Sequence, residues 1–146
     1  MRNPHNQAII EEFRANGGDV GGTFAGVPIA LLHHRGRHTG VEYVAPVVYL
    51  ADKPDEIFIF ASNGGASTHP HWYENIRKAG TVTIEIGTDC LNATVTEVDG
   101  PRRDELFAEQ ALRHPRFAAY EHTAAAAGRT IPVLVLQPIQ QAGRRL

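Results

Sequence analysis

Residues 62–76, SNGGASTHPHWYENI, contain two adjacent glycines, two histidines and the only tryptophan of the chain. His69 and His71 could contribute to a metal site, but zinc and iron sites need at least a third ligand. Pro70 between them indicates the start of a helix, in which residues two apart do not share a face. We therefore expect no metal at these histidines.

The same stretch could instead hold an organic ligand. Its glycines, Ser62 and the N-terminus of the following helix offer several hydrogen-bond donors, which would suit the carbonyls of a planar heterocycle or an anionic tail. Trp72 and Tyr73 could stack on such a ring, and core packing is the alternative use of both side chains. The stretch is thus a candidate binding loop that leads into an aromatic helix.

A second polar cluster, HHRGRHTG at residues 33–40, is expected in a hairpin turn. Arg35, Arg37, the Thr39 hydroxyl and the exposed backbone of two glycines could form a nest for a phosphate or a carboxylate. A solvated basic turn is the alternative. The cluster lacks the lysine and the spacing of a nucleotide P-loop, which excludes that motif.

The sequence gives little support for a hydrolase. It contains no G-x-S-x-G segment, and neither Ser62 nor Ser67 has an evident partner base. Tyr120 follows Phe117 by about one helical turn, a spacing typical of packing, and a catalytic phenol is the alternative.

Hydrophobic periodicity predicts the secondary structure around these clusters. Six strands are expected, at residues 27–34, 42–50, 55–62, 81–86, 90–98 and 130–138. Helices are expected at residues 6–18, 70–79, 99–114 and 115–127. Consecutive hairpins of such strands favour an α+β, mainly β architecture, an antiparallel barrel with peripheral helices.

Composition limits the class of protein. The 146 residues fit one domain, with an N-terminal helix and connector over residues 1–20 and a frayed tail at 139–146. A formal charge of −2 gives no field for nucleic acid, and the single cysteine fits a reducing cytoplasm. Ile9, Ile10 and Phe13 form a short apolar face, expected to pack on the barrel, with peripheral membrane contact as the alternative.

Taken in order, GRHTG, PVVYL, FASNGGASTHPHWYENI and RTIPVLVLQP resemble the deazaflavin-dependent nitroreductase family of actinobacteria. The resemblance implies a split β-barrel that binds the 8-hydroxy-5-deazaflavin coenzyme F420. The reaction it implies is transfer of hydride from the reduced coenzyme to an electron-poor acceptor such as a quinone, a nitroaromatic or an enone. It also implies a monomer or a homodimer.

The resemblance implies a role for each matching position. The phosphate and oligoglutamate tail of the coenzyme would meet Arg37, His38, Thr39 and Gly40. The deazaflavin side of the pocket would be lined by Val44, Ala45, Pro46, Val47, Val48 and Tyr49. Polar and backbone contacts would come from Ala61, Ser62 and Asn63. The coenzyme would be covered by His71, Trp72, Tyr73, Glu74 and Asn75. Tyr120 would face the substrate as the catalytic residue, positioning it or donating a proton.

Three positions depart from the family pattern. His38 and Asn63 stand where lysine is common, and Tyr43 stands where arginine is common. The lower positive charge keeps two alternatives open, an FMN-dependent oxidoreductase of the same fold and a protein that binds a coenzyme or ligand without turnover. A protonated His38 would compensate in part, so coenzyme affinity is expected to fall between mild acid and mild base.

Overall fold

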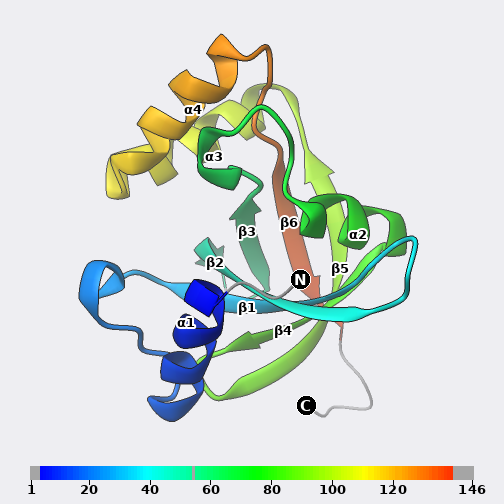
Figure 1. Ribbon diagram of the computed structural model, residues 1–146. Helices are drawn as coiled ribbons and strands as arrows, with labels where there is room; N and C mark the ends of the chain where they lie inside the picture. The colour runs from blue at the N-terminus through cyan, green and yellow to red at the C-terminus, as the bar shows by residue number, and fades with distance from the viewer. Residues whose placement is uncertain (1–3, 54, 140–146) are drawn as a thin grey trace.

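Six antiparallel strands close into a barrel in the computed structural model, which describes residues 4–53 and 55–139 (Figure 1). The strands are β1 (Ile29–Arg35), β2 (Glu42–Lys53), β3 (Glu56–Phe60), β4 (Thr81–Ile86), β5 (Asp89–Val98) and β6 (Val133–Pro138). The helices are α1 (Pro4–Ala15), α2 (His71–Ala79), α3 (Gly100–Arg113) and α4 (Arg116–Ala126), with short 3₁₀ helices η1 (Gly22–Phe24) and η2 (Asn63–Gly65). The expected split barrel of six strands and four helices is confirmed for the described residues.

The strand order around the barrel is β1-β2-β3-β6-β5-β4. Consecutive hairpins were expected throughout, but the connections that contain α2 and the α3–α4 pair interrupt them, so β3 lies beside β6 and β1 beside β4. Strand β2 serves both halves of the barrel, because residues 42–48 pair with β1 and residues 49–53 pair with β3. The β1–β2 hairpin therefore extends beyond the barrel, toward α2 (Figure 1).

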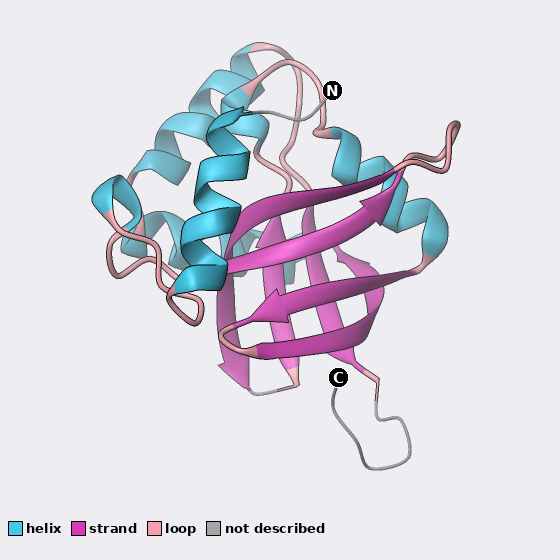
Figure 2. Cartoon of the chain, turned by 60° about the horizontal axis from the view of Figure 1, so that its bottom comes forward, coloured by secondary structure: helices cyan, strands magenta, loops and turns pink. Residues whose placement is uncertain are grey.

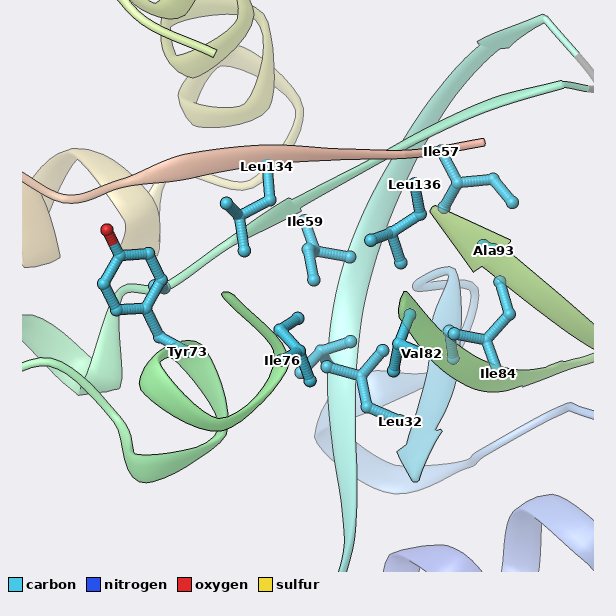
Figure 3. Close-up of a cluster of buried hydrophobic side chains, with 13 residues drawn as sticks. Leu32, Ile57, Ile59, Tyr73, Ile76, Val82, Ile84, Ala93, Leu134 and Leu136 are labelled. Carbon is cyan, nitrogen blue, oxygen red and sulfur yellow. The ribbon is translucent and has the colours of Figure 1, made fainter. Parts of the chain in front are cut away.

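Aliphatic side chains from alternate strand positions fill the barrel (Figure 3). Leu32 of β1, Ile59 of β3 and Leu134 of β6 are completely buried there, as the two-residue period of strands requires. Ile76 points into the same cluster from α2. Burying one such side chain stabilises the fold by about 1.5–3 kcal/mol, so this contact holds α2 on the barrel.

The outer face of β1 and β2 is covered by α1. Ile9, Ile10 and Phe13 are buried against Ile29 and Leu31 of β1. The expected packing of α1 on the barrel is confirmed, and the membrane alternative is not supported because the apolar side chains that it needs are already buried. None of the described helices is long and apolar enough to cross a membrane.

Helices α3 and α4 cover the outer face of β2, β3 and β6, and Figure 2 shows the helices gathered on one side of the barrel. The contact is aromatic, since Phe60 of β3 lies edge-on to Phe107 and to Phe117, with ring centroids 5.9 Å apart in both pairs. This cluster fixes α4, which carries Tyr120.

Some element boundaries differ from those expected. Strand β2 continues to Lys53, past the expected end at residue 50, because Lys53 still pairs with Glu56 across the turn. Gly18 closes α1 as expected, with φ of 105° and its N–H donated to the Phe13 carbonyl. The expected frayed tail lies outside the described residues beyond position 139, and the single domain over residues 1–146 stays a prediction.

Candidate functional site

A cavity of about 490 Å³ lies between α1, the β1–β2 hairpin and α2. It is lined by Asn6, Gln7, Ile10, Arg14, His34, Gly36, Arg37, His38, Thr39, Tyr43, Val44, Ala45, His71, Trp72 and Asn75. None of these residues is acidic, and two of them are arginines. The volume falls within the range of about 300–1,000 Å³ found for small-molecule sites.

The hairpin turn that borders the cavity is held by its own hydrogen bonds. Gly36 donates its N–H to the Val41 carbonyl and Gly40 donates to the Gly36 carbonyl, both at 2.8 Å. Gly40 has φ of 74°, a conformation that glycine adopts without strain. The Thr39 hydroxyl accepts the Val41 N–H, so it closes the turn as well as bordering the cavity.

Asn75 of α2 ties this turn to the barrel. The backbone N–H and the guanidinium Nη1 of Arg37 both donate to Asn75 Oδ1, at 3.1 and 2.9 Å. The other end of the amide, Nδ2, lies 2.9 Å from Nδ1 of His34. Asn75 is 5% exposed and His34 is 9% exposed, so these contacts are made largely out of water.

His34 is held as a neutral imidazole. Its ring stacks on Tyr43, with centroids 5.6 Å apart and an interplanar angle of 27°. Burial, and then the nearby positive charge of His33 and His71, lower the pKa of His34 from 6.5 to about 4. The ring therefore stays uncharged at neutral pH.

Arg14 brings α1 to the cavity through an ion pair that spans three elements. Its guanidinium donates twice to Glu85 of β4, at 3.2 and 2.6 Å, and Glu85 also contacts His33 Nε2 at 2.6 Å. The hydrogen bond from Arg14 is the main reason that the pKa of Glu85 is lowered. Arg37, in contrast, has no carboxylate within ion-pair distance among the described residues.

The structure brings eight of the expected coenzyme-binding residues to this cavity: Arg37, His38, Thr39, Val44, Ala45, His71, Trp72 and Asn75. Ten others do not line it: Gly40, Pro46, Val47, Val48, Tyr49, Ala61, Ser62, Asn63, Tyr73 and Glu74. In β2 the difference follows position along the strand, because Val44 and Ala45 lie near the open hairpin whereas Val47 belongs to the barrel core.

The expected binding loop after β3 is organised by Arg129. Its guanidinium donates to the carbonyls of Ala61, Ser62 and Ala66, and it lies 2.9 Å from His69 Nδ1. Arg129 begins the RTIP segment, which lies more than sixty residues further along the chain. The loop after β3 and the RTIP segment are therefore joined by one side chain that holds the loop in shape.

Tyr73 and Tyr120 both lie outside the lining of the cavity. The Tyr73 hydroxyl donates to Glu97 at 2.6 Å, and burial together with this carboxylate raises the pKa of Tyr73 to about 12. Tyr120 packs edge-on against Phe117, and its backbone carbonyl lies 2.8 Å from the place that a Cβ on Gly65 would occupy. Gly65 therefore permits the close contact between η2 and α4.

Seven lining residues were not among the expected coenzyme-binding residues: Asn6, Gln7, Ile10, Arg14, His34, Gly36 and Tyr43. Four of them come from α1, whose apolar face predicted packing without indicating which strands it would cover. His34 and Gly36 belong to the 33–40 cluster in which the anion nest was expected, and Tyr43 follows it by three residues, so sequence position was the available signal. For metal, no group of three or more His, Cys, Asp or Glu in the described part of the chain is placed to hold an ion.

Comparison with known proteins identifies the family. Residues 6–138 match the family model described as F420H(2)-dependent quinone reductase. The chain belongs to this family. The family name confirms the expected oxidoreductase class and the deazaflavin coenzyme.

Individual relatives agree with this assignment. A protein of Mycobacterium tuberculosis, provisionally named as a quinone reductase of this type, is 30% identical over 112 residues, which are 77% of this chain and 91% of that protein. A solved structure named F420-H2 Dependent Reductase (FDR-A) has a TM-score of 0.65 and 27% identity, and covers 75% of this chain and 94% of its own. Another solved structure, described as a domain-swapped dimer, has the same TM-score and identity and covers 75% of this chain and 80% of its own.

Proposed function

We propose that this protein transfers hydride from reduced coenzyme F420 to a quinone, and that nitroaromatics and enones are further acceptors. The observation that carries the proposal is the cavity at the hairpin. It combines the guanidinium of Arg37, which has no carboxylate partner among the described residues, with aromatic walls from Tyr43 and Trp72. A planar coenzyme with an anionic tail needs both features. The residues present therefore fit the coenzyme that the family name implies.

In this proposal the hairpin turn holds the anionic tail. The Arg37 guanidinium keeps donors beyond the one that it gives to Asn75, and His38 and Thr39 lie beside it at the cavity edge. Hydrogen bonds to charged groups are worth about 1.5–3 kcal/mol each, so Arg37 can offset part of the charge missing at Tyr43 and Asn63.

Reduced F420 would supply the hydride, and the chain would supply orientation and a dry pocket. Trp72, Val44 and Ile10 offer apolar surface that excludes water from the bound ring. For Tyr120 we propose the role of positioning the acceptor or donating a proton to it, which rests on family resemblance because Tyr120 does not line the cavity. The expected contacts from residues 61–63 rest on the same resemblance.

The test is a titration of the purified protein with oxidised F420, with FMN in parallel. Trp72 is the only tryptophan and borders the cavity, so we expect its fluorescence to be quenched as F420 binds with micromolar affinity. The control is Trp72→Phe, which should lose the signal while the coenzyme's own fluorescence still reports binding. Tighter binding of FMN than of F420 would mean that FMN is the coenzyme. Binding of neither would refute the proposal that the protein uses a coenzyme of this kind.

Steady-state reduction separates an enzyme from a carrier. We expect reduced F420 to be oxidised by menadione in the presence of the protein, and Tyr120→Phe to slow this reaction at least tenfold. Coenzyme binding without reduction of any acceptor would favour the carrier alternative. An unchanged rate in Tyr120→Phe would assign Tyr120 to packing alone.

We also propose that the protein works as a monomer or as a homodimer of complete barrels. All six strands of the barrel come from one chain, so closure needs no exchanged segment. Light scattering over a range of protein concentrations measures the mass directly, and a fixed mass larger than a dimer would refute the proposal.

A further inference from the structure

We infer that His34 donates the hydrogen of Nε2 to a carbonyl oxygen of the planar ring bound in the cavity. The Arg37–Asn75 pair fixes the tautomer that makes this donation. The inference deepens the proposed function, on which the identity of the bound ring rests. It assigns a ligand contact to a residue of β1 that the family resemblance did not include.

The contacts of Asn75 fix the orientation of its side-chain amide. Its Oδ1 receives two hydrogens from Arg37, one from the backbone N–H and one from the guanidinium. Both groups can only donate, so the atom that faces them must be the amide oxygen. The amide nitrogen is therefore the atom that faces His34, and the usual ambiguity between amide oxygen and nitrogen is removed.

The orientation of the Asn75 amide in turn fixes which nitrogen of His34 carries the proton. Asn75 Nδ2 is also only a donor, and it lies 2.9 Å from His34 Nδ1. Nδ1 must then accept, which places the single proton of the neutral ring on Nε2. A second proton on Nδ1 would set two donors against each other, and burial separately lowers the pKa of His34.

The Nε2 atom of His34 is available to a ligand in the cavity. His34 is 9% exposed and borders the cavity, and no residue of the described chain hydrogen-bonds to its Nε2. Nε2 is not among the fully buried polar atoms without a partner in the described chain, so it is open to the cavity, where a ligand can accept its hydrogen in place of water. Stacking on Tyr43 and the bond to Asn75 hold the ring, so the donor has a fixed direction.

A carbonyl oxygen is the acceptor that suits this donor. The pyrimidinedione of a deazaflavin carries such oxygens, and so does a quinone. A donor at a quinone oxygen would also stabilise the negative charge that develops there as hydride arrives. The shared chemistry is a conjugated carbonyl, and the experiment below separates the two sources.

The tautomer can be measured without any ligand. A long-range ¹H–¹⁵N spectrum of the free protein at neutral pH should show His34 with a pyridine-type Nδ1 and a pyrrole-type Nε2. In Asn75→Asp the new carboxylate should accept from Nδ1, which becomes pyrrole-type, while the contact with Arg37 is retained. A protonated Nδ1 in the unaltered protein would overturn the inference.

Two variants of His34 then test the contact with a ligand. His34→Asn keeps an acceptor near the position of Nδ1 but has no atom at Nε2, whereas His34→Gln can reach the Nε2 position with an amide N–H. We expect the affinity for the molecule that carries the carbonyl to fall about 2- to 12-fold in His34→Asn, which is the range for one hydrogen bond. We expect this affinity to recover in His34→Gln. A raised dissociation constant for oxidised F420 assigns the carbonyl to the coenzyme. A raised KM for menadione with an unchanged dissociation constant for F420 assigns it to the acceptor.

If both constants are unchanged in His34→Asn, the inference is wrong. If the unaltered protein binds no F420, the proposed function fails first. The tautomer spectrum and an FMN titration of the same variants then still decide whether His34 is a donor, because the FMN ring carries the same carbonyls.

Discussion

The lowered pKa of His34 predicts a specific dependence of stability on pH. The folded protein keeps His34 neutral down to about pH 4, whereas the unfolded chain protonates it below its ordinary pKa of 6.5. Between these values the unfolded state binds one more proton, so the free energy of unfolding falls as the pH is lowered. The loss begins near pH 6.5 and ends near pH 4.

The magnitude follows from the two pKa values. The whole interval of 2.5 units from 6.5 to 4 corresponds to about 3.4 kcal/mol, at about 1.36 kcal/mol per unit. Between about pH 7 and about pH 5 the linkage relation gives a loss of at most about 2 kcal/mol, an upper limit because water in the adjoining cavity screens the charge.

His34→Asn isolates this contribution. The variant has no titrating group at this position, so its unfolding free energy should fall by about 2 kcal/mol less than that of the unaltered protein between the same pH values. Urea unfolding at both pH values measures the difference, and a baseline destabilisation of the variant cancels because only the change with pH is compared. His33 and His71 are present in both proteins and cancel to first order.

Equal changes in the two proteins would refute the reasoning. That result would mean that folded His34 takes up a proton as readily as the unfolded chain does. Burial beside the cavity could then not hold the ring in its neutral form.

Two further predictions use matched pairs of arginines. Arg37→Gln should weaken F420 binding by roughly tenfold to a hundredfold and reduce its salt dependence. Arg113→Gln alters an exposed cation on α3 outside the cavity lining, so it should change the affinity less than threefold. Equal effects in isothermal titration calorimetry would contradict the role of Arg37. Arg129→Met should lower the free energy of unfolding by about 3 kcal/mol, because three loop carbonyls lose their donor. Arg113→Met removes only an exposed ion pair with Glu109 on α3, so it should lower the free energy of unfolding by under about 1 kcal/mol. Similar denaturation midpoints for the two variants would show that Arg129 does not hold the loop.

Local signals in the sequence were sufficient for the elements and for part of the site. Gly80 ends α2 in the left-handed conformation, and the alternation around residues 87–89 predicted the β4–β5 hairpin. The glycines and the arginine of the β1–β2 turn predicted an anion nest, and the turn does border the cavity. These features depend on backbone preferences within a few residues, which a sequence states directly.

The tertiary structure decided which of these parts meet. Arg37 and Asn75 are 38 positions apart, Asn75 and His34 are 41 apart, and Arg129 reaches a loop more than sixty positions away. Each contact exists because closure of the barrel and the connection through α2 bring distant segments together. From the sequence alone, hydrophobic periodicity determined the antiparallel barrel, and the family resemblance gave the split barrel and the coenzyme class. The position of α1, the hydrogen bond of His34 and the contacts of Arg129 depend on packing between distant segments, which no local pattern encodes.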